Sequence, residues 1–127
     1  MKYKLLVLDV DGTLLNDAKE ISKRTLASLL KVQQMGIRVA LASGRPTYGL
    51  MPLAKTLELG NYGGFIISYN GGQIINAQNG EILFERRINP EMLPYLEKKA
   101  RKNNFAIFTY HDDTILTCLL YTSDAAD

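Results

Sequence analysis

The stretch Leu5-Leu6-Val7-Leu8-Asp9-Val10-Asp11-Gly12-Thr13 joins a short, unbroken apolar run to the pattern Asp-x-Asp-Gly. An apolar run without alternation is typical of a strand that is buried on both faces, as in a parallel sheet. We therefore predict a strand that ends near Asp9 and continues into a polar loop. This arrangement favours an α/β fold, in which ligands bind beyond the carboxyl ends of the strands.

The residues that follow predict a helix and a second strand. Ser22 is a favourable N-cap, and Gly36 occupies the position of the glycine that ends a helix. The apolar segment 37–42 then predicts a strand with Ser43-Gly44-Arg45 at its tip. A strand, a helix and a strand in this order form a βαβ unit, so the two strands are expected to be parallel.

A second helix is expected to run to Gly60, with Pro52 either in its first turn or at a kink. Segment 64–69 predicts a third buried strand. Asn70-Gly71 and Asn79-Gly80 are turn signals, and they separate two further short strands, expected at 73–76 and 81–87.

After residue 88 the pattern changes. Asn89-Pro90 begins a predicted helix that continues to about Lys102, and the segments 105–110 and 114–117 predict a hairpin. We therefore expect a Rossmann-like, doubly wound parallel sheet in residues 1–88 and the beginning of an α+β cap domain in residues 89–117.

Composition excludes several classes of protein. The 127 residues are 46% hydrophobic, and the formal net charge of +2 is too small for a basic nucleic-acid-binding or membrane-binding face. The single cysteine, Cys118, cannot form an intramolecular disulfide, and the apolar run 5–8 is too short for a signal peptide or a membrane span. We expect a cytoplasmic protein, and the sequence leaves its oligomeric state open.

The predicted strand ends bring Asp9, Asp11, Ser43 and Asn70 to one crevice. Two carboxylates at positions i and i+2 can divide the chemistry, with Asp9 as a nucleophile and Asp11 as a proton donor and acceptor. Backbone N–H groups at Gly12 can cradle a phosphate, and the Ser43 hydroxyl can donate to it. A cation must offset the like charges, and oxygen-only ligands favour Mg²⁺.

Three segments, 9–15, Ala42-Ser43-Gly44-Arg45-Pro46 and Tyr69-Asn70-Gly71-Gly72, resemble the Cof-type branch of the haloacid-dehalogenase-like hydrolases in order and spacing. The resemblance implies a Mg²⁺-dependent phosphatase that acts on small phosphorylated metabolites through an aspartyl-phosphate. It implies that Asp9 is the nucleophile, and that Asp9 and the backbone carbonyl of Asp11 bind the metal. The residues expected at the acid/base and substrate positions are Asp11, Gly12, Thr13, Ser43, Gly44, Arg45 and Asn70.

Two motifs of that family are not found in this sequence: a later lysine and an acidic metal-binding loop. The lysines at 98, 99 and 102 lie on the expected first cap helix, and we do not substitute them for the missing lysine. We therefore expect the N-terminal part of a longer protein, inactive by itself. Residues 118–127 can be encoded by a sequence that resembles a transposase-end sequencing adaptor, so we expect a read-through tail without function.

Alternative functions differ in what they require of the Asp-x-Asp-Gly pattern that begins at Asp9. A phosphosugar mutase of the same superfamily would use the same residues. A phospho-acceptor receiver domain is also doubly wound, but it needs no carboxylate at the position of Asp11. A calcium loop beginning at Asp9 is disfavoured because Leu14 stands where such a loop requires glycine. The sequence therefore favours an enzyme that hydrolyses a phosphoryl bond.

Overall fold

The computed structural model describes residues 2–118 of the chain. It divides into two compact units, with the division between Arg86 and Arg87. The first unit contains a sheet and two long helices, and the second contains one helix and a hairpin. Each unit is described by itself.

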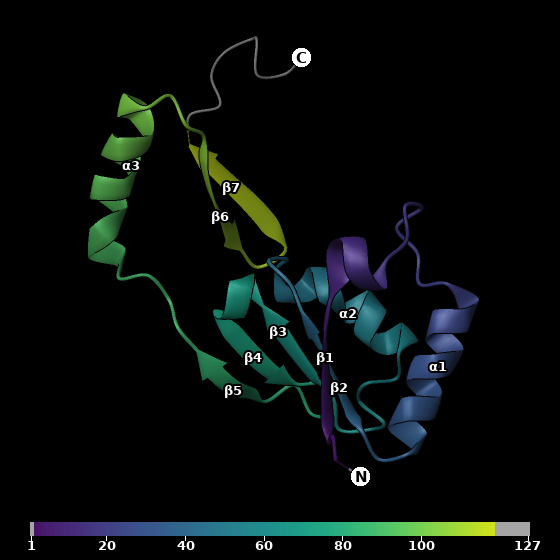
Figure 1. Cartoon of the computed structure of the whole chain (residues 1–127). Helices are drawn as coiled ribbons and strands as arrows, with labels where there is room; N and C mark the ends of the chain where they lie inside the picture. Colours follow the sequence, from purple (N-terminus) through teal and green to yellow (C-terminus); the bar gives the residue numbers. More distant parts are fainter. Residues whose placement is uncertain (1, 119–127) are drawn as a thin grey trace. The chain divides into compact units, whose positions relative to one another are not determined.

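The first unit is a five-stranded sheet in the order β1-β2-β3-β4-β5 (Figure 1). β1 pairs with β2 and β2 with β3 in parallel, whereas β3–β4 and β4–β5 are antiparallel. The parallel strands and the α/β class are as predicted, and the two short strands extend the sheet as hairpins. Its elements are β1 (Leu5–Asp9), η1 (Val10–Leu14), α1 (Lys23–Gln34), β2 (Arg38–Ala42), α2 (Thr47–Thr56), β3 (Phe65–Ser68), η2 (Tyr69–Gly71), β4 (Gln73–Asn76) and β5 (Ile82–Glu85).

Local sequence signals set the ends of α1. The Ser22 hydroxyl oxygen accepts a hydrogen bond from the backbone N–H of Thr25 at 3.1 Å, which confirms Ser22 as the N-cap. Gly36 has a φ of +88°, the left-handed conformation expected of a glycine that follows a helix. Pro52 lies inside α2 and not in its first turn, and the helix continues past it. The proline lacks the N–H that would bond to the carbonyl of Tyr48.

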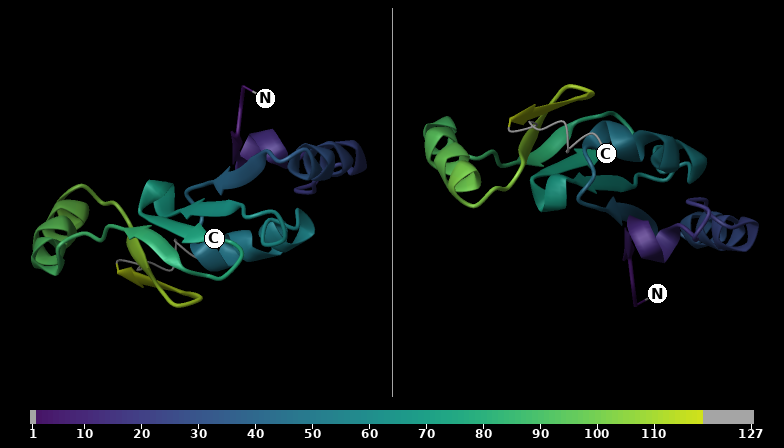
Figure 2. Two further views of the ribbon diagram at one scale, coloured as in Figure 1. Left: turned by 90° about the horizontal axis from the view of Figure 1, so that it is seen from below. Right: turned by 90° about the horizontal axis from the view of Figure 1, so that it is seen from above.

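Both helices pack on the same face of the sheet. Leu29 of α1 and Leu50 of α2 belong to one buried cluster with Val39, Leu41 and Ile66 of the strands. Figure 2 shows α1 and α2 side by side. This face contributes most of the core and fixes the direction in which the loops after β1, β2 and β3 leave the sheet.

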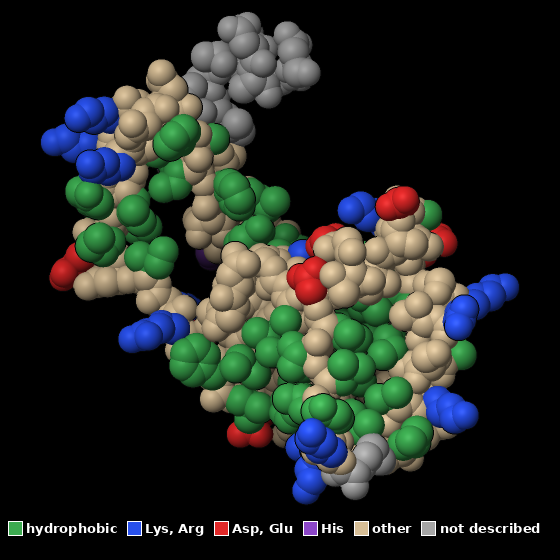
Figure 3. Space-filling model, viewed as in Figure 1, with side chains coloured by type: hydrophobic (Ala, Val, Ile, Leu, Met, Phe, Trp, Pro, Cys, Tyr) green, Lys and Arg blue, Asp and Glu red, His purple; other side chains and the backbone are tan. Residues whose placement is uncertain are grey.

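Side chains on the other face alternate with those of the core. Leu5 and Val7 of β1 point away from the helices, and each is 49% exposed. Among the described residues of the first unit, no helix covers this face and no strand pairs with the outer edge of β1. Figure 3 shows hydrophobic side chains gathered over the strands of this unit. The sheet therefore has an apolar face and an open edge.

The second unit contains η3 (Pro90–Met92), α3 (Leu93–Lys102), β6 (Ile107–His111) and β7 (Thr114–Cys118). The Asn89 side chain accepts a hydrogen bond from the N–H of Glu91 at 3.0 Å and caps the helical segment. β6 and β7 form an antiparallel hairpin in which Ile107 lies opposite Cys118. The tail expected at 118–127 therefore begins at the last residue of β7, and its residues 119–127 lie outside the described part of the chain.

Candidate active site

The loop after β1 holds two aspartates on a tightly wound turn. Asp9 is the last residue of β1, and the η1 turn closes with a hydrogen bond from the N–H of Leu15 to the carbonyl of Val10 at 3.0 Å. Gly12 has a φ of +78°, while a Cβ at that position would meet nothing within 4 Å. Glycine is therefore required there by backbone conformation and not by space.

The loop after β2 is fixed by backbone hydrogen bonds to the end of β3. The N–H of Ser43 donates to the carbonyl of Ile67, and the carbonyl of Ser43 accepts from the N–H of Asn70 at 3.1 Å. The carbonyl of Arg45 accepts from the N–H of Tyr69 at 3.0 Å, and its N–H donates to the Ser43 hydroxyl oxygen at 3.1 Å. These bonds hold the predicted residues Ser43 and Asn70 next to each other.

The loop after β3 has an unusual backbone. Tyr69, Asn70 and Gly71 all have positive φ values, of 52°, 54° and 89°. A Cβ on Gly44 would lie 2.9 Å from the side-chain oxygen of Asn70, so the two residues pack closely. The Asn-Gly pair therefore serves both as the turn between β3 and β4 and as a wall of the candidate site. Backbone strain held by its surroundings is a common feature of functional sites.

An open cavity of about 360 Å³ lies at the ends of β1, β2 and β3. It is lined by Asp9, Ala42, Ser43, Gly44, Ile67, Asn70 and Gly71. Four of the predicted site residues therefore share this cavity, whereas Asp11, Gly12, Thr13 and Arg45 do not line it. A larger cavity of about 640 Å³ lies beside α2 and contains none of the predicted site residues. We assign the chemistry to the smaller cavity, because there the carboxylate of Asp9 and the hydroxyl of Ser43 meet at strand ends.

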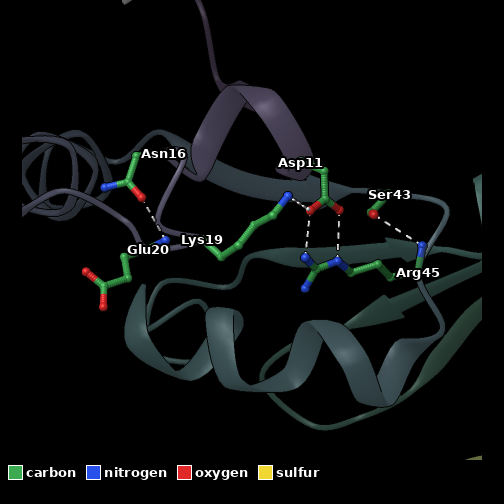
Figure 4. Close-up of polar contacts among 6 residues, drawn as sticks. All are labelled: Asp11, Asn16, Lys19, Glu20, Ser43 and Arg45. Atoms are coloured by element: carbon green, nitrogen blue, oxygen red, sulfur yellow. Dashed lines mark hydrogen bonds and ion pairs between the residues drawn. The ribbon is translucent and has the colours of Figure 1, made fainter.

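Asp11 forms a two-pronged ion pair with Arg45 (Figure 4). Arg45 Nε donates to Asp11 Oδ2 at 2.8 Å, and Arg45 Nη2 donates to Asp11 Oδ1 at 2.6 Å. Lys19 Nζ lies 3.8 Å from Asp11 Oδ1. The hydrogen bonds from Arg45 hold the pKa of Asp11 below its ordinary range; desolvation opposes this shift, and the charges of Arg45 and Lys19 add to it.

This pairing was not predicted from the sequence. Ser43-Gly44-Arg45 was expected to bind substrate, and a contact between Arg45 and Asp11 was not considered. The available signal was the convergence of the two loops on one sheet edge, which brings a cation and a carboxylate together. Lys19, from the loop between η1 and α1, was also missed, since nothing in its local sequence marks it.

A polar network beneath the site was missed as well. Thr47, the first residue of α2, donates its hydroxyl to Gln73 Oε1 at 2.6 Å and accepts from the hydroxyl of Ser68 at 2.7 Å. Ser68 is completely buried. Gln73 Nε2 in turn donates to Glu85 Oε1 at 2.8 Å. The network joins the start of α2 to β3, β4 and β5, and so fixes the helix that begins two residues after Arg45.

The donor atoms available for a metal ion are all oxygens. Among residues 2–118 no group of three His, Cys, Asp or Glu side chains is placed to hold a metal. Mg²⁺ does not require such a cage, because it usually keeps several waters and binds through one or two carboxylates and substrate phosphates. The Asp9 carboxylate fits that requirement, whereas both Asp11 carboxylate oxygens are engaged by Arg45.

Known proteins resemble this chain in sequence and in structure. A family model of haloacid dehalogenase-like hydrolases matches residues 6–118. The crystal structure of a haloacid dehalogenase-like hydrolase from Bacteroides thetaiotaomicron has a TM-score of 0.82 and 50% identity, covering 94% of this chain and 46% of that chain. The 5-amino-6-(5-phospho-D-ribitylamino)uracil phosphatase of Bacillus subtilis is 35% identical over 85 residues, 67% of this chain and 32% of that protein. The HMP-PP phosphatase of Yersinia pestis is 26% identical over 111 residues, 87% of this chain and 39% of that protein.

The chain thus spans less than half the length of each of these proteins. The regions that match contain both the sheet of the first unit and the start of the second. Within the described residues, no helix has the length and apolar character needed to cross a membrane.

Proposed function

This chain belongs to the haloacid dehalogenase-like hydrolase family, and from that premise we propose that its protein is a phosphatase for small phosphorylated metabolites. One observation carries the proposal: the carboxyl ends of three parallel strands meet at one open cavity, with Asp9 and Ser43 in its lining. The Asp11 carboxylate is held beside that cavity by the loop that carries Ser43. Relatives named as phosphatases of a ribitylaminouracil phosphate and of HMP-PP support this class of substrate.

In the proposed reaction a carboxylate oxygen of Asp9 attacks phosphorus, and the bond from phosphorus to the leaving oxygen breaks. Asp11, in its protonated form, gives its proton to the leaving alcohol. Asp11 then takes a proton from a water molecule, which attacks the aspartyl-phosphate and releases inorganic phosphate and the Asp9 carboxylate. Ser43 and the backbone N–H groups of the loops would bind the phosphoryl oxygens.

A divalent cation, Mg²⁺ in our proposal, would neutralise charge between the Asp9 carboxylate and the phosphate. The need for it follows from the site, since Asp9 must approach an anionic phosphoryl group. Asp9 and the backbone carbonyl of Asp11 are the residues of this chain that would bind it. Both oxygens of the Asp11 carboxylate accept hydrogen bonds from Arg45, so this carboxylate is not among the metal ligands that we propose.

The second carboxylate distinguishes this site from that of a phospho-acceptor receiver. A receiver accumulates its aspartyl-phosphate, whereas in our proposal Asp11 promotes its hydrolysis. A mutase of the same family would share every described site residue, and no observation favours it here. We further propose that this chain is the N-terminal part of a cytoplasmic enzyme, and that it is inactive by itself.

A chimera tests the proposed function. Residues 2–117 replace the matching part of the Bacteroides thetaiotaomicron hydrolase, to which this chain is 50% identical. With Mg²⁺ present, phosphate release is measured from a panel of sugar and nucleotide monophosphates. We expect turnover by the chimera and a loss of at least about a thousandfold in Asp9→Asn, because an amide is not a competent nucleophile.

The matched control is Asp17→Asn, the same chemical change at an exposed aspartate in the loop before α1. It should retain the activity of the chimera. An Asp9→Asn chimera with unchanged turnover would refute the assignment of the nucleophile. An inactive chimera, under conditions in which the parent hydrolase releases phosphate, would refute the proposal that this chain carries a competent phosphatase site.

A further inference from the structure

Arg45 pairs with both oxygens of the carboxylate to which the proposed mechanism gives the proton transfers. Arg45 Nε and Nη2 donate to the two different carboxylate oxygens, at 2.8 and 2.6 Å. The guanidinium of Arg45 holds both carboxylate oxygens, and Lys19 Nζ lies near Oδ1, so a leaving group would have to compete with these cations for Asp11. The structure therefore shows the site with Asp11 bound to Arg45, and release by Arg45 would free the carboxylate for a ligand.

Arg45 is well placed to find another partner. It follows Ser43 and Gly44, which line the candidate cavity. A guanidinium binds a phosphate with the same parallel pair of N–H donors that it offers to a carboxylate, and a phosphate dianion carries more charge than one carboxylate. The side chains of Arg45 and Asp11 are 34% and 44% exposed, so the pair can open without disturbing the core.

We propose that Arg45 is a positioning residue shared between two anions: it holds Asp11 in the ligand-free site and transfers to the phosphoryl group when a phosphorylated ligand enters. This inference rests on the phosphatase function proposed above and deepens it. The transfer makes the Asp11 carboxylate available only when a phosphate is in place. Lys19, 3.8 Å from the same carboxylate, stays beside Asp11 after Arg45 has left.

The backbone around Arg45 does not depend on its side chain. Its N–H bonds to the Ser43 hydroxyl oxygen, and its carbonyl accepts from the N–H of Tyr69. Thr47, two residues later, is tied to Ser68 and Gln73. Replacing the guanidinium therefore removes the ion pair and leaves the loop in its place, which makes Arg45 suitable for a mutational test.

The test is a double-mutant cycle in the full 127-residue chain, with inorganic phosphate as the probe and with pH and Mg²⁺ concentration fixed. Dissociation constants are measured from the backbone amide signals of Gly44 and Asn70 by NMR titration. The four proteins are the unmutated chain, Asp11→Asn, Arg45→Gln and the double variant. Circular dichroism spectra verify that all four are folded.

If Asp11 competes with phosphate for Arg45, Asp11→Asn lowers the dissociation constant of phosphate when Arg45 is present. This decrease should be roughly two- to fivefold larger than the decrease in the Arg45→Gln background, as for an exposed ion pair. Loss of the negative charge alone would change the dissociation constant by the same factor in both backgrounds. Lys19→Gln is the matched control, because it also removes a cation from the surroundings of Asp11 but breaks no two-pronged bond. In that background Asp11→Asn should keep its full effect.

A second measurement follows the transfer directly. The Arg45 Nε–H signal and the Asp11 carboxyl carbon signal should both shift on saturation with phosphate in the unmutated chain. In Arg45→Lys, which keeps the charge but lacks the paired donors, the Asp11 signal should shift less. A purely structural role for Arg45 would leave the Asp11 signal unchanged by phosphate.

The failures of the two proposals are distinguishable. Phosphate binding with equal effects of Asp11→Asn in both backgrounds, or with an unmoved Asp11 signal, would overturn the sharing of Arg45 and leave the phosphatase proposal intact. Absence of phosphate binding in all four folded proteins would overturn the phosphate site itself, and with it this inference.

Discussion

Two glycine-to-alanine substitutions in the first unit should change stability in opposite directions. Gly64 precedes β3, and a Cβ there would lie 2.6 Å from the carbonyl oxygen of Val39 and 3.0 Å from Cβ of Leu59. Gly49 lies inside α2, and a Cβ there would meet its nearest neighbours at 3.7 Å, which is ordinary contact. Neither glycine has a positive φ, so the two sites differ in space and not in backbone conformation.

The structure sets the size of each effect. A carbon and a carbonyl oxygen normally approach to about 3.3 Å or more, so Gly64→Ala must separate backbone atoms by roughly 0.7 Å. Hydrogen bonds from Gly64 N–H to Leu59 O at 2.8 Å and from Ala77 N–H to Gly64 O at 3.0 Å resist that movement. We expect a loss of about 1–3 kcal/mol in the free energy of unfolding. Gly49→Ala should gain about 0.5–1 kcal/mol, because alanine loses less backbone entropy in a helix.

Urea denaturation of the full chain, followed by circular dichroism, measures both changes. The midpoint should fall for Gly64→Ala and rise for Gly49→Ala, with similar dependence on urea concentration in both. Gly64→Ala with the stability of the unmutated chain would show that the contact with Val39 is not as described. The packing that sets β3 against β2, and so brings Ser43 to Asn70, would then need to be revised.

Three further predictions follow from the site and from the uncovered sheet face. The Asp11 carboxyl, followed by carbon NMR, should titrate at lower pH in the unmutated chain than in Arg45→Gln. Because the pKa of Asp11 is lowered in the folded state, the ion pair stabilises the fold at pH values above the ordinary carboxyl pKa. This stabilisation disappears as the pH falls through the lowered pKa. Gly12→Ala should cost about 1–2 kcal/mol of unfolding free energy in the same urea assay, because alanine is strained at a φ of +78°; unchanged stability would contradict the turn described. Val7→Lys should reduce self-association, measured as light scattering by concentrated protein, because Val7 lies exposed on the open-edge strand β1. Scattering equal to that of the unmutated chain would exclude this strand as a site of self-association.

Local signals in the sequence were sufficient to predict the helices and strands of the first unit, and to predict that the strand ends lie close together. Ser22 and Gly36 mark the limits of α1 because capping depends on neighbouring residues alone. Asp9, Ser43 and Asn70 could be placed in one crevice because parallel strands end at the same edge of a sheet.

Contacts between side chains of different loops could not be predicted in the same way. The Asp11–Arg45 pair joins residues 34 positions apart, and its geometry depends on how two loops pack. The bonds among Thr47, Ser68 and Gln73 likewise require three elements to be in place. The first-turn alternative for Pro52 was wrong for a related reason: whether a helix tolerates an internal proline depends on what can replace the lost hydrogen bond.

The central claim is that Asp9 is the nucleophile of a phosphatase, and a trapped phosphoryl adduct tests it most directly. The chimera described above is mixed with a substrate that it hydrolyses, quenched in acid within milliseconds, reduced with borohydride and digested for mass spectrometry. Reduction of an aspartyl-phosphate gives homoserine, and we predict homoserine at position 9, with none in Asp9→Asn. Turnover accompanied by modification at another residue, or by no adduct at any time point, would contradict the account.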